Sequence, residues 1–320
     1  MDKRQTFMEL FPNEMKCLFQ GCLQYLTQLS EIRFRVAQPI CVYMNGNELF
    51  LTKNGDFTTN VTGAKRITIT EIEHFFAHIC EFSPYAFLKE LGNGYITTKG
   101  GHRIGVVGEM IKDENGCYRM KQIAFMNIRI AHEVPGVAKP ILDYLFENKQ
   151  FQSTMIVSPP GVGKTTLLRD IIRNISDGYG QYRGLNVSVV DERSEIAGCY
   201  LGIPQNAVGM RTDVLDGCEK RRGILLLLRS MAPQVIAADE VSGEDELFAL
   251  TKAAHCGCRF LLTMHAEDYA SFSDTSILKR LRSTNMIQRM IILSVKEGKR
   301  WFEIRSMKGD IVCSNWLDAQ

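Results

Sequence analysis

The chain has 320 residues, enough for two domains of ordinary size, and its 45% hydrophobic and 23% charged residues are typical of a globular protein rather than a disordered one. The net charge of +2 at pH 7 gives no sign of bulk attraction to nucleic acid or to a membrane surface. The ten cysteines are scattered without a C-x-x-C pair, so we expect reduced thiols in a cytoplasmic protein, not a zinc site or a disulfide framework. Apolar runs stay well below the roughly 18 residues of a transmembrane helix, and no signal-peptide pattern opens the chain.

The first ~130 residues predict a small α+β domain. A helix-like N-terminus precedes residues 31–51, whose alternation around Asn45-Gly46 predicts strands joined by a hairpin turn. Residues 70–82 have the apolar spacing of a helix. Residues 94–130 predict several strands separated by glycine turns and by a turn at residues 113–116.

A boundary is expected within residues 132–140, which hold two prolines and a glycine. We therefore predict an N-terminal domain over residues 1–134 and a second domain over residues 135–320. In the second, short apolar runs mostly alternate with helix-length segments; the runs are residues 154–158, 186–190, 234–238, 259–263 and 290–295. This layout predicts an α/β fold with a mainly parallel sheet and helices on both faces.

The segment SPPGVGKTT lies between a predicted strand and a predicted helix, which is the context of a phosphate-binding loop. Backbone N–H groups of the loop, together with the positive end of the helix dipole, are expected to surround phosphate oxygens. The expected nucleotide-binding residues are Pro160, Gly161, Val162, Gly163, Lys164, Thr165 and Thr166. Lys164 would bind the β- and γ-phosphates, and the Thr165 hydroxyl would bind magnesium. Ser158 replaces the first glycine of the usual pattern, but it precedes the residues that wrap the phosphate.

An acidic pair follows a second predicted core strand. Asp239 and Glu240 come directly after residues 235–238, at the carboxyl end, where open α/β sheets bind ligands. Asp239 is expected to hold magnesium, and Glu240 to polarise the water that attacks the γ-phosphate. The adjacent glutamate favours ATP hydrolysis by a RecA-like motor over a P-loop kinase. An N-K-x-D segment that would read guanine does not occur, which favours ATP.

Two further segments carry candidate catalytic residues. Thr263 and His265 come just after another core strand and are expected to contact the γ-phosphate or the attacking water. The segment DERSE, residues 191–195, is either an exposed charged turn or a source of a second catalytic carboxylate, Glu192, beside Arg193. His74 and His78 share a helix face, but they lack the glutamate of H-E-x-x-H, so a structural role is favoured over a metal site.

In this order, residues 31–48, 100–109, 125–136, 159–173, 189–198, 202–220 and 225–241 resemble the sporulation stage III protein AA family of secretion and pilus motor ATPases. The resemblance covers nearly the whole chain. It implies a RecA-like P-loop ATPase domain after a secretion-type N-terminal domain, with ATP and Mg²⁺ as ligands. It also implies a hexameric ring in the mother-cell cytoplasm, peripheral at the inner face of the membrane. Such a ring would power or gate a secretion-like channel between mother cell and forespore, with membrane-protein partners.

The resemblance further implies that arginines complete the nucleotide site. Arg103 and Arg129 match the N-domain arginines of such motors, and motor-domain candidates are Arg193, Arg211 and Arg229. Cys258 stands where these motors carry a first histidine, whereas His265 stands at the second. Two alternatives stay open: a nucleic-acid-stimulated RecA-like ATPase, which the low charge weighs against, and a nucleotide-gated scaffold with little turnover.

Overall fold

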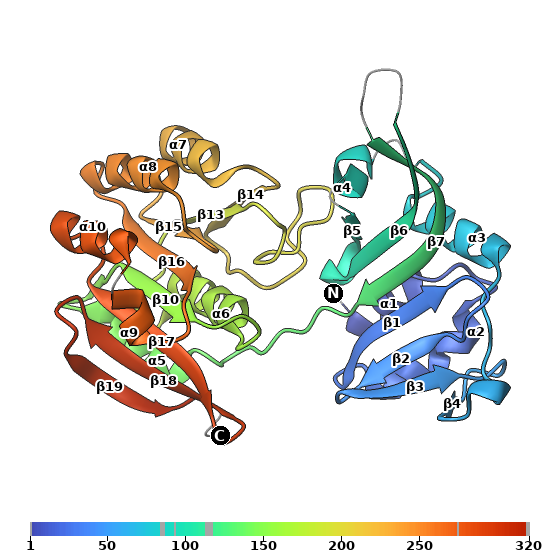
Figure 1. The fold of residues 1–320 in the computed structure, drawn as a ribbon. Helices are drawn as coiled ribbons and strands as arrows, with labels where there is room; N and C mark the ends of the chain where they lie inside the picture. Colours follow the sequence, from blue (N-terminus) through green and yellow to red (C-terminus); the bar gives the residue numbers. More distant parts are fainter. Residues whose placement is uncertain (1, 84–86, 93, 113–117, 274, 318–320) are drawn as a thin grey trace. The chain divides into compact units, whose positions relative to one another are not determined.

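The computed structural model describes residues 2–83, 87–92, 94–112, 118–273 and 275–317. The chain divides into two compact units (Figure 1). Unit 1 comprises Met1–His132 together with Gly198–Gln205, and unit 2 comprises Glu133–Ala197 and Asn206–Gln320. The division into domains at residues 1–134 and 135–320 stays a prediction.

The strands of unit 1 form an antiparallel sheet in the order β4-β3-β2-β1-β7-β6-β5. Their bounds are β1 Leu29–Arg35, β2 Cys41–Met44, β3 Asn47–Leu51, β4 Phe57–Thr58, β5 Tyr95–Thr97, β6 Arg103–Lys112 and β7 Tyr118–Arg129. The predicted hairpin is confirmed: Asn45 and Gly46, between β2 and β3, both have the positive φ of a type I′ turn, 50° and 79°. The turn expected at residues 113–116 lies outside the described residues.

Helices pack on this sheet through an aromatic core. They are α1 Lys3–Glu9, α2 Lys16–Phe19, α3 Ile69–Ile79 and α4 Leu88–Gly92. Thr68 begins α3 with a capping box, in which its side chain and that of Glu71 each accept from the other's backbone N–H. The fully buried rings of Phe11 and Phe19 stack at 3.8 Å between centroids, and Phe75 of α3 stacks on Phe11 at 5.6 Å.

Unit 2 is built on a mixed sheet in the order β14-β13-β15-β16-β10-β17-β18-β19. The neighbours from β14 to β17 are parallel, and β18 and β19 continue the sheet antiparallel. The bounds are β10 Thr154–Ser158, β13 Val187–Asp191, β14 Thr212–Asp216, β15 Val235–Ala238, β16 Arg259–His265, β17 Arg289–Lys296, β18 Lys299–Ser306 and β19 Ile311–Trp316. Short two-stranded ribbons are formed by β8 Phe146–Glu147 with β9 Gln150–Phe151, and by β11 Gly178–Tyr179 with β12 Tyr182–Arg183.

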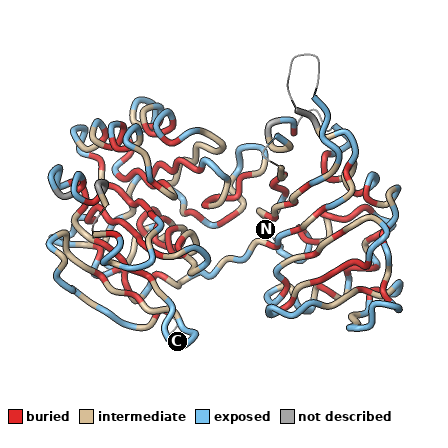
Figure 2. Tube along the Cα trace, in the orientation of Figure 1, coloured by how far each residue is buried: buried red, intermediate tan, exposed pale blue. Residues whose placement is uncertain are grey.

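Helices cover both faces of this sheet, as the sequence predicted. Alternate residues of β10, Met155 and Val157, pack in one buried cluster with α7 Lys220–Ser230, α8 Glu244–His255, α9 Tyr269–Ser273 and α10 Ser276–Thr284. The helix α6 Lys164–Asp177 packs against β10, β13 and β16 and buries its leucine and isoleucine stripe (Figure 1). A short helix, α5 Lys139–Leu142, precedes β8. The central strands are buried along their length, whereas the connecting loops are largely exposed (Figure 2).

Among the described residues, no helix is both long enough and apolar enough to cross a membrane.

Candidate active site

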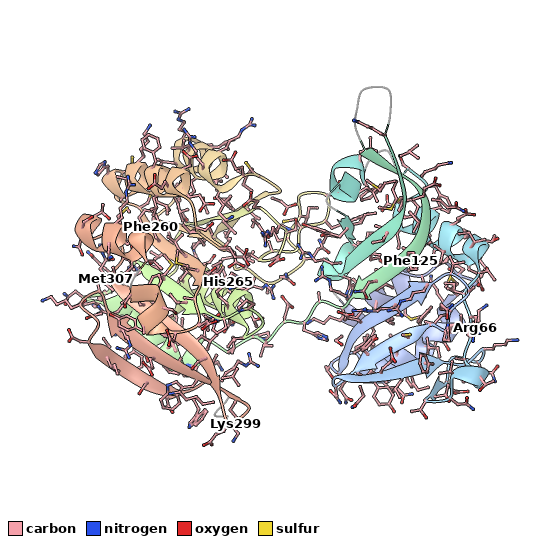
Figure 3. All side chains as sticks on the ribbon, viewed as in Figure 1. Arg66, Phe125, Phe260, His265, Lys299 and Met307 are labelled. Atoms are coloured by element: carbon pink, nitrogen blue, oxygen red, sulfur yellow. The ribbon has the colours of Figure 1, made fainter. Side chains whose placement is uncertain are left out.

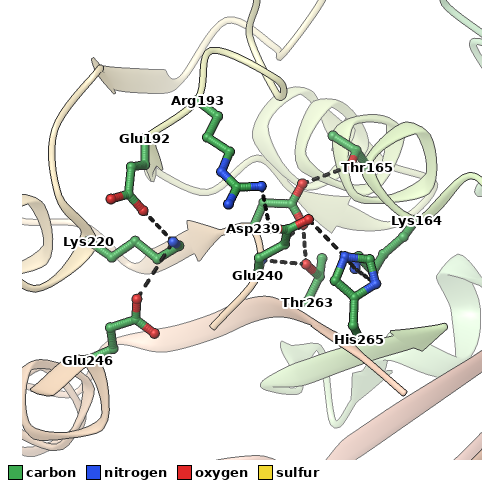
Figure 4. Close-up of polar contacts among 10 residues, drawn as sticks. All are labelled: Lys164, Thr165, Glu192, Arg193, Lys220, Asp239, Glu240, Glu246, Thr263 and His265. Carbon is green, nitrogen blue, oxygen red and sulfur yellow. Dashed lines mark hydrogen bonds and ion pairs between the residues drawn. The ribbon is translucent and has the colours of Figure 1, made fainter. Parts of the chain in front are cut away.

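The candidate residues of unit 2 converge at one edge of its sheet. Because β10, β13, β15 and β16 run parallel, their carboxyl ends meet there, at Ser158, Asp191, Ala238 and His265. Side chains that lie up to about a hundred residues apart in the chain are thereby brought into contact (Figure 4). The sequence predicts nucleotide binding at this edge.

The loop between β10 and α6 has the backbone of a phosphate-binding loop. Gly161 and Gly163 have φ values of 78° and 104°, a region that residues with side chains rarely adopt. Gly163 is the N-cap of α6, so the first N–H groups of a 14-residue helix face the loop without partners in the helix. Ser158 is the last residue of β10, paired in register with His265 and 1% exposed. Its departure from the usual glycine therefore lies in the strand, where no unusual backbone conformation is needed.

Thr165 and Asp239 form the contact expected at a magnesium site. The Thr165 hydroxyl donates to Asp239 Oδ2 at 2.7 Å, and the buried Thr263 hydroxyl donates to Asp239 Oδ1. A hydroxyl and a carboxylate are the hard oxygen ligands that Mg²⁺ takes from proteins when phosphates and water supply the rest. The residues present therefore fit the ion.

Glu240 is held by four contacts in a strained backbone conformation. Its φ is 54°, which costs a residue with a side chain about 1–3 kcal/mol. Its N–H donates to Thr263 Oγ1 at 2.8 Å and to Asp239 Oδ1 at 3.1 Å. Its carboxylate accepts from His265 Nε2 and from Arg193 Nη1, each at 2.8 Å. The strand end thus fixes both the backbone and the direction of this carboxylate.

His265 joins Glu240 to the loop lysine. Nε2 of the ring donates to Glu240, and Lys164 Nζ lies 3.0 Å from Nδ1 and 3.1 Å from Nε2. Burial lowers the pKa of Lys164 despite the nearby Asp239, Glu240 and Glu195. Burial of Glu240 opposes ionisation, but the His265 hydrogen bond and the Arg193, His265 and Lys164 charges outweigh it and lower the pKa of this carboxyl. Glu240 is therefore an ionised carboxylate at neutral pH.

The segment after β13 is a folded turn rather than a free charged loop. Asp191 is 2% exposed, and its carboxylate accepts from the N–H groups of Glu195, Ile196 and Ala197. Burial raises the pKa of Asp191, although these hydrogen bonds partly offset it. The turn directs Arg193 to the carboxylate of Glu240.

Glu192 is paired with a lysine, whereas its expected catalytic role would place it by the magnesium ion and the attacking water. It forms an ion pair with Lys220, the first residue of α7, whose ammonium is also 3.6 Å from Glu246. Figure 4 shows this group beside the Asp239 and Glu240 contacts and not among them. Its role as a second catalytic carboxylate stays a prediction. Lys220 was missed by sequence analysis because no local pattern marks the partner of a distant glutamate.

The other arginine candidates belong to other elements of the two units. Arg103 and Arg129 are cross-strand neighbours on β6 and β7 of unit 1, and Arg103 stacks over the Tyr95 ring at 4.4 Å. Arg211 donates to the carbonyl of Ser176 at 2.9 Å, at the end of α6 remote from the loop. Arg229 is exposed in the last turn of α7. His74 and His78 are the histidines considered as a metal site in the sequence. The Nε2 atom of His78 contacts the carbonyl oxygen of Glu9 at 3.0 Å.

Comparison with known proteins gives the family. The family model described as sporulation stage III, protein AA matches residues 1–311. The chain belongs to that family. A curated relative, Stage III sporulation protein AA of Bacillus subtilis (strain 168), is 35% identical over 291 residues, which are 91% of each chain. The Arabidopsis thaliana protein SEEDLING PLASTID DEVELOPMENT 1 is 28% identical over 46% of this chain and 21% of its own.

Solved structures share the fold of this family member. The ATPase DotB of Legionella pneumophila is 18% identical with a TM-score of 0.59, covering 93% of this chain and 81% of its own. The pilus retraction motor PilT, solved with bound ADP, is 16% identical with a TM-score of 0.59 over 90% and 81% of the two chains. The fold is therefore the RecA-like secretion-ATPase fold, after an antiparallel N-terminal unit, that the sequence predicted.

Proposed function

We propose that the chain is a magnesium-dependent ATPase that powers or gates a secretion-like complex during endospore formation. The observation that carries the proposal is the convergence of Lys164, the Thr165–Asp239 pair and Glu240 at the carboxyl edge of the parallel sheet. A binding-only site needs the loop and the lysine, but it has no use for an ionised, oriented glutamate beside them.

Each residue of this edge takes one role. The loop N–H groups and Lys164 bind the phosphates, and the lysine exchanges its His265 contact for phosphate oxygens. Thr165 and Asp239 would hold Mg²⁺, which would neutralise charge on the phosphates. Glu240 accepts a proton from the attacking water, while Thr263 holds its backbone N–H and His265 holds its carboxylate. Figure 4 shows how these groups face one another.

The assembly and its setting follow from the family rather than from the geometry. We infer a homo-oligomeric ring, a hexamer, on the cytoplasmic face of the mother-cell membrane, bound to membrane proteins of the channel between mother cell and forespore. In such a ring Arg103 and Arg129 would reach the phosphates of another subunit's site. An arginine supplied in this way is worth about 10³–10⁵ in rate, so the isolated subunit would be nearly inactive.

A Glu240→Gln variant tests the hydrolytic role. We expect the purified variant to bind ATP and to assemble as wild type does, with phosphate release lowered by about 10²–10⁴-fold. The measurements are phosphate release over a range of protein concentrations and molar mass with and without Mg-ATP. Equal, slow release by both assembled proteins would contradict the ATPase and favour a nucleotide-gated scaffold. A salt-sensitive rise in rate on adding DNA or RNA would instead favour a nucleic-acid-stimulated enzyme.

A further inference from the structure

An arginine that the nucleotide motifs do not include lies against the phosphate-binding loop. A Cβ placed on Gly163 would be 3.2 Å from Arg300 Nη1 and 3.9 Å from its Cδ. Gly163 is the N-cap of α6, where the unpaired N–H groups of the helix collect. The guanidinium of Arg300 therefore lies beside the groups that would bind phosphate.

The sheet explains how a residue so late in the chain reaches this loop. β17 runs parallel to β10, so its carboxyl end lies at the same edge as the loop. β18 returns antiparallel from a turn at Glu297-Gly298, so its second residue, Arg300, is also at that edge. Phe302 and Ile304, the alternate residues that share Arg300's side of the strand, are fully buried and fix the register.

The position of Arg300 in the strand order indicates which end of a nucleotide it faces. Asp239, Glu240 and His265 end β15 and β16, on one side of β10. Arg300 comes from β18, on the other side. With the terminal phosphate by Glu240, a nucleotide that crosses the phosphate-binding loop would bring its α-phosphate to the side of β17 and β18.

We propose that Arg300 binds the α-phosphate of the nucleotide held by the same chain and so sets the affinity for ATP and ADP alike. This inference rests on the proposed ATPase site. Arginine suits the role because its guanidinium can donate two parallel hydrogen bonds to phosphate oxygens, whereas lysine offers a single point charge. Because the α-phosphate is not the group transferred to water, Arg300 in this role is a binding residue and not part of the hydrolytic set.

The test compares Arg300→Ala, Arg300→Lys and Lys299→Ala with wild type. Lys299 is exposed at the tip of the same hairpin (Figure 3), and its loss removes an equal charge from the adjacent, oppositely facing position. Binding of Mg-ADP is measured by calorimetry, and KM and kcat for ATP by phosphate release. We expect Arg300→Ala to raise Kd for ADP and KM for ATP by the same factor, about tenfold or more, with kcat nearly unchanged. Arg300→Lys should fall between, and Lys299→Ala should stay within about twofold of wild type.

Other outcomes overturn the proposal in distinguishable ways. If the wild-type protein binds neither ADP nor ATP, the proposed nucleotide site itself is contradicted. Wild-type binding with unchanged affinity in Arg300→Ala would leave that site intact and remove only the role of Arg300. A raised KM for ATP with an unchanged Kd for ADP would show that Arg300 binds the terminal phosphate and not the α-phosphate. A loss of affinity that tracks a lowered Tm and is equal in both Arg300 variants would make the arginine structural.

Discussion

Arg193 donates a hydrogen bond to Glu240 within the same chain, 2.8 Å from Nη1 to the carboxylate. The resemblance to secretion motors made Arg193 a candidate for phosphate contact, whereas the structure joins it to the expected catalytic base. Arg193 is largely exposed, at 63% of its side chain, so the pair adds little to stability. Its consequence is electrostatic, because the guanidinium charge helps to lower the pKa of Glu240.

Replacing Arg193 with Ala should lower kcat by about tenfold or more, because Glu240 loses one of its orienting contacts. The pKa of Glu240 should also rise toward its ordinary value, so the acid limb of the kcat profile should move to higher pH. The measurement is phosphate release across that limb at saturating Mg-ATP. Arg221→Ala, which removes an exposed arginine paired with Asp245, is the matched control. An unmoved acid limb with unchanged kcat would contradict the role of Arg193.

A second prediction concerns the buried hydroxyl beneath Glu240. Thr263→Val keeps the shape of the side chain but removes the acceptor of the Glu240 N–H and the donor to Asp239. We expect a loss of about 1–3 kcal/mol in the free energy of unfolding, together with a lower kcat, because the strained backbone of Glu240 loses its support. Denaturant unfolding and steady-state rates measure the two effects.

Ser188→Ala supplies the control for this variant. Ser188 also lies buried, on β13, and its hydroxyl has no partner among the described residues. Its removal should leave stability and kcat close to wild type. Equal effects of the two substitutions on stability and kcat would show that the hydrogen bonds of the Thr263 hydroxyl contribute to neither.

The arginine pair of unit 1 allows a test of whether the active site is shared between subunits. Arg103 and Arg129 are directly opposite on β6 and β7, an arrangement in which like charges repel. Arg103→Ala removes this repulsion and also the stacking of Arg103 on the Tyr95 ring, so Tm should change little while turnover falls by about 10³-fold or more. Mixing it with Glu240→Gln should restore part of the activity, because some sites would combine an intact glutamate with an intact arginine. If assembled mixtures recover no ATPase activity, Arg103 either acts on the site of its own chain or does not act at the site.

Stability should depend on pH through His102 of unit 1. Burial, with smaller contributions from His132 and Lys3, lowers the pKa of His102 to about 4 from 6.5. Its Nδ1 accepts from the Ala131 N–H at 3.1 Å, so the folded state keeps the ring neutral. The unfolded state protonates first, so this stability is complete above pH 6.5 and is lost as pH falls toward about 4.

The expected loss over that interval is about 3 kcal/mol in the free energy of unfolding. Denaturant unfolding at several pH values measures it. A His102→Asn variant, which keeps an acceptor for Ala131 and cannot titrate, should show a correspondingly flatter dependence. An equal slope in both proteins would assign the pH dependence to other groups.

The sequence by itself determined the features that depend on near neighbours in the chain. The Asn45-Gly46 hairpin, the turn from β10 into α6 and the acidic pair after β15 follow from the backbone preferences of a few adjacent residues. The family resemblance extended these local patterns to a RecA-like fold, because the motifs occur in one order. The antiparallel β18 and β19 were not predicted, since apolar alternation does not reveal the sheet to which a strand is added.

The tertiary structure alone decided which charges meet. Arg193 reaches Glu240 because a turn built on Asp191 aims it there, and Glu192 is paired with Lys220 instead of joining the site. Arg300 reaches the loop because the hairpin of β17 and β18 extends the sheet beyond β10. Such pairings depend on strand order and crossover direction, and these are set by the packing of the whole unit rather than by any local segment.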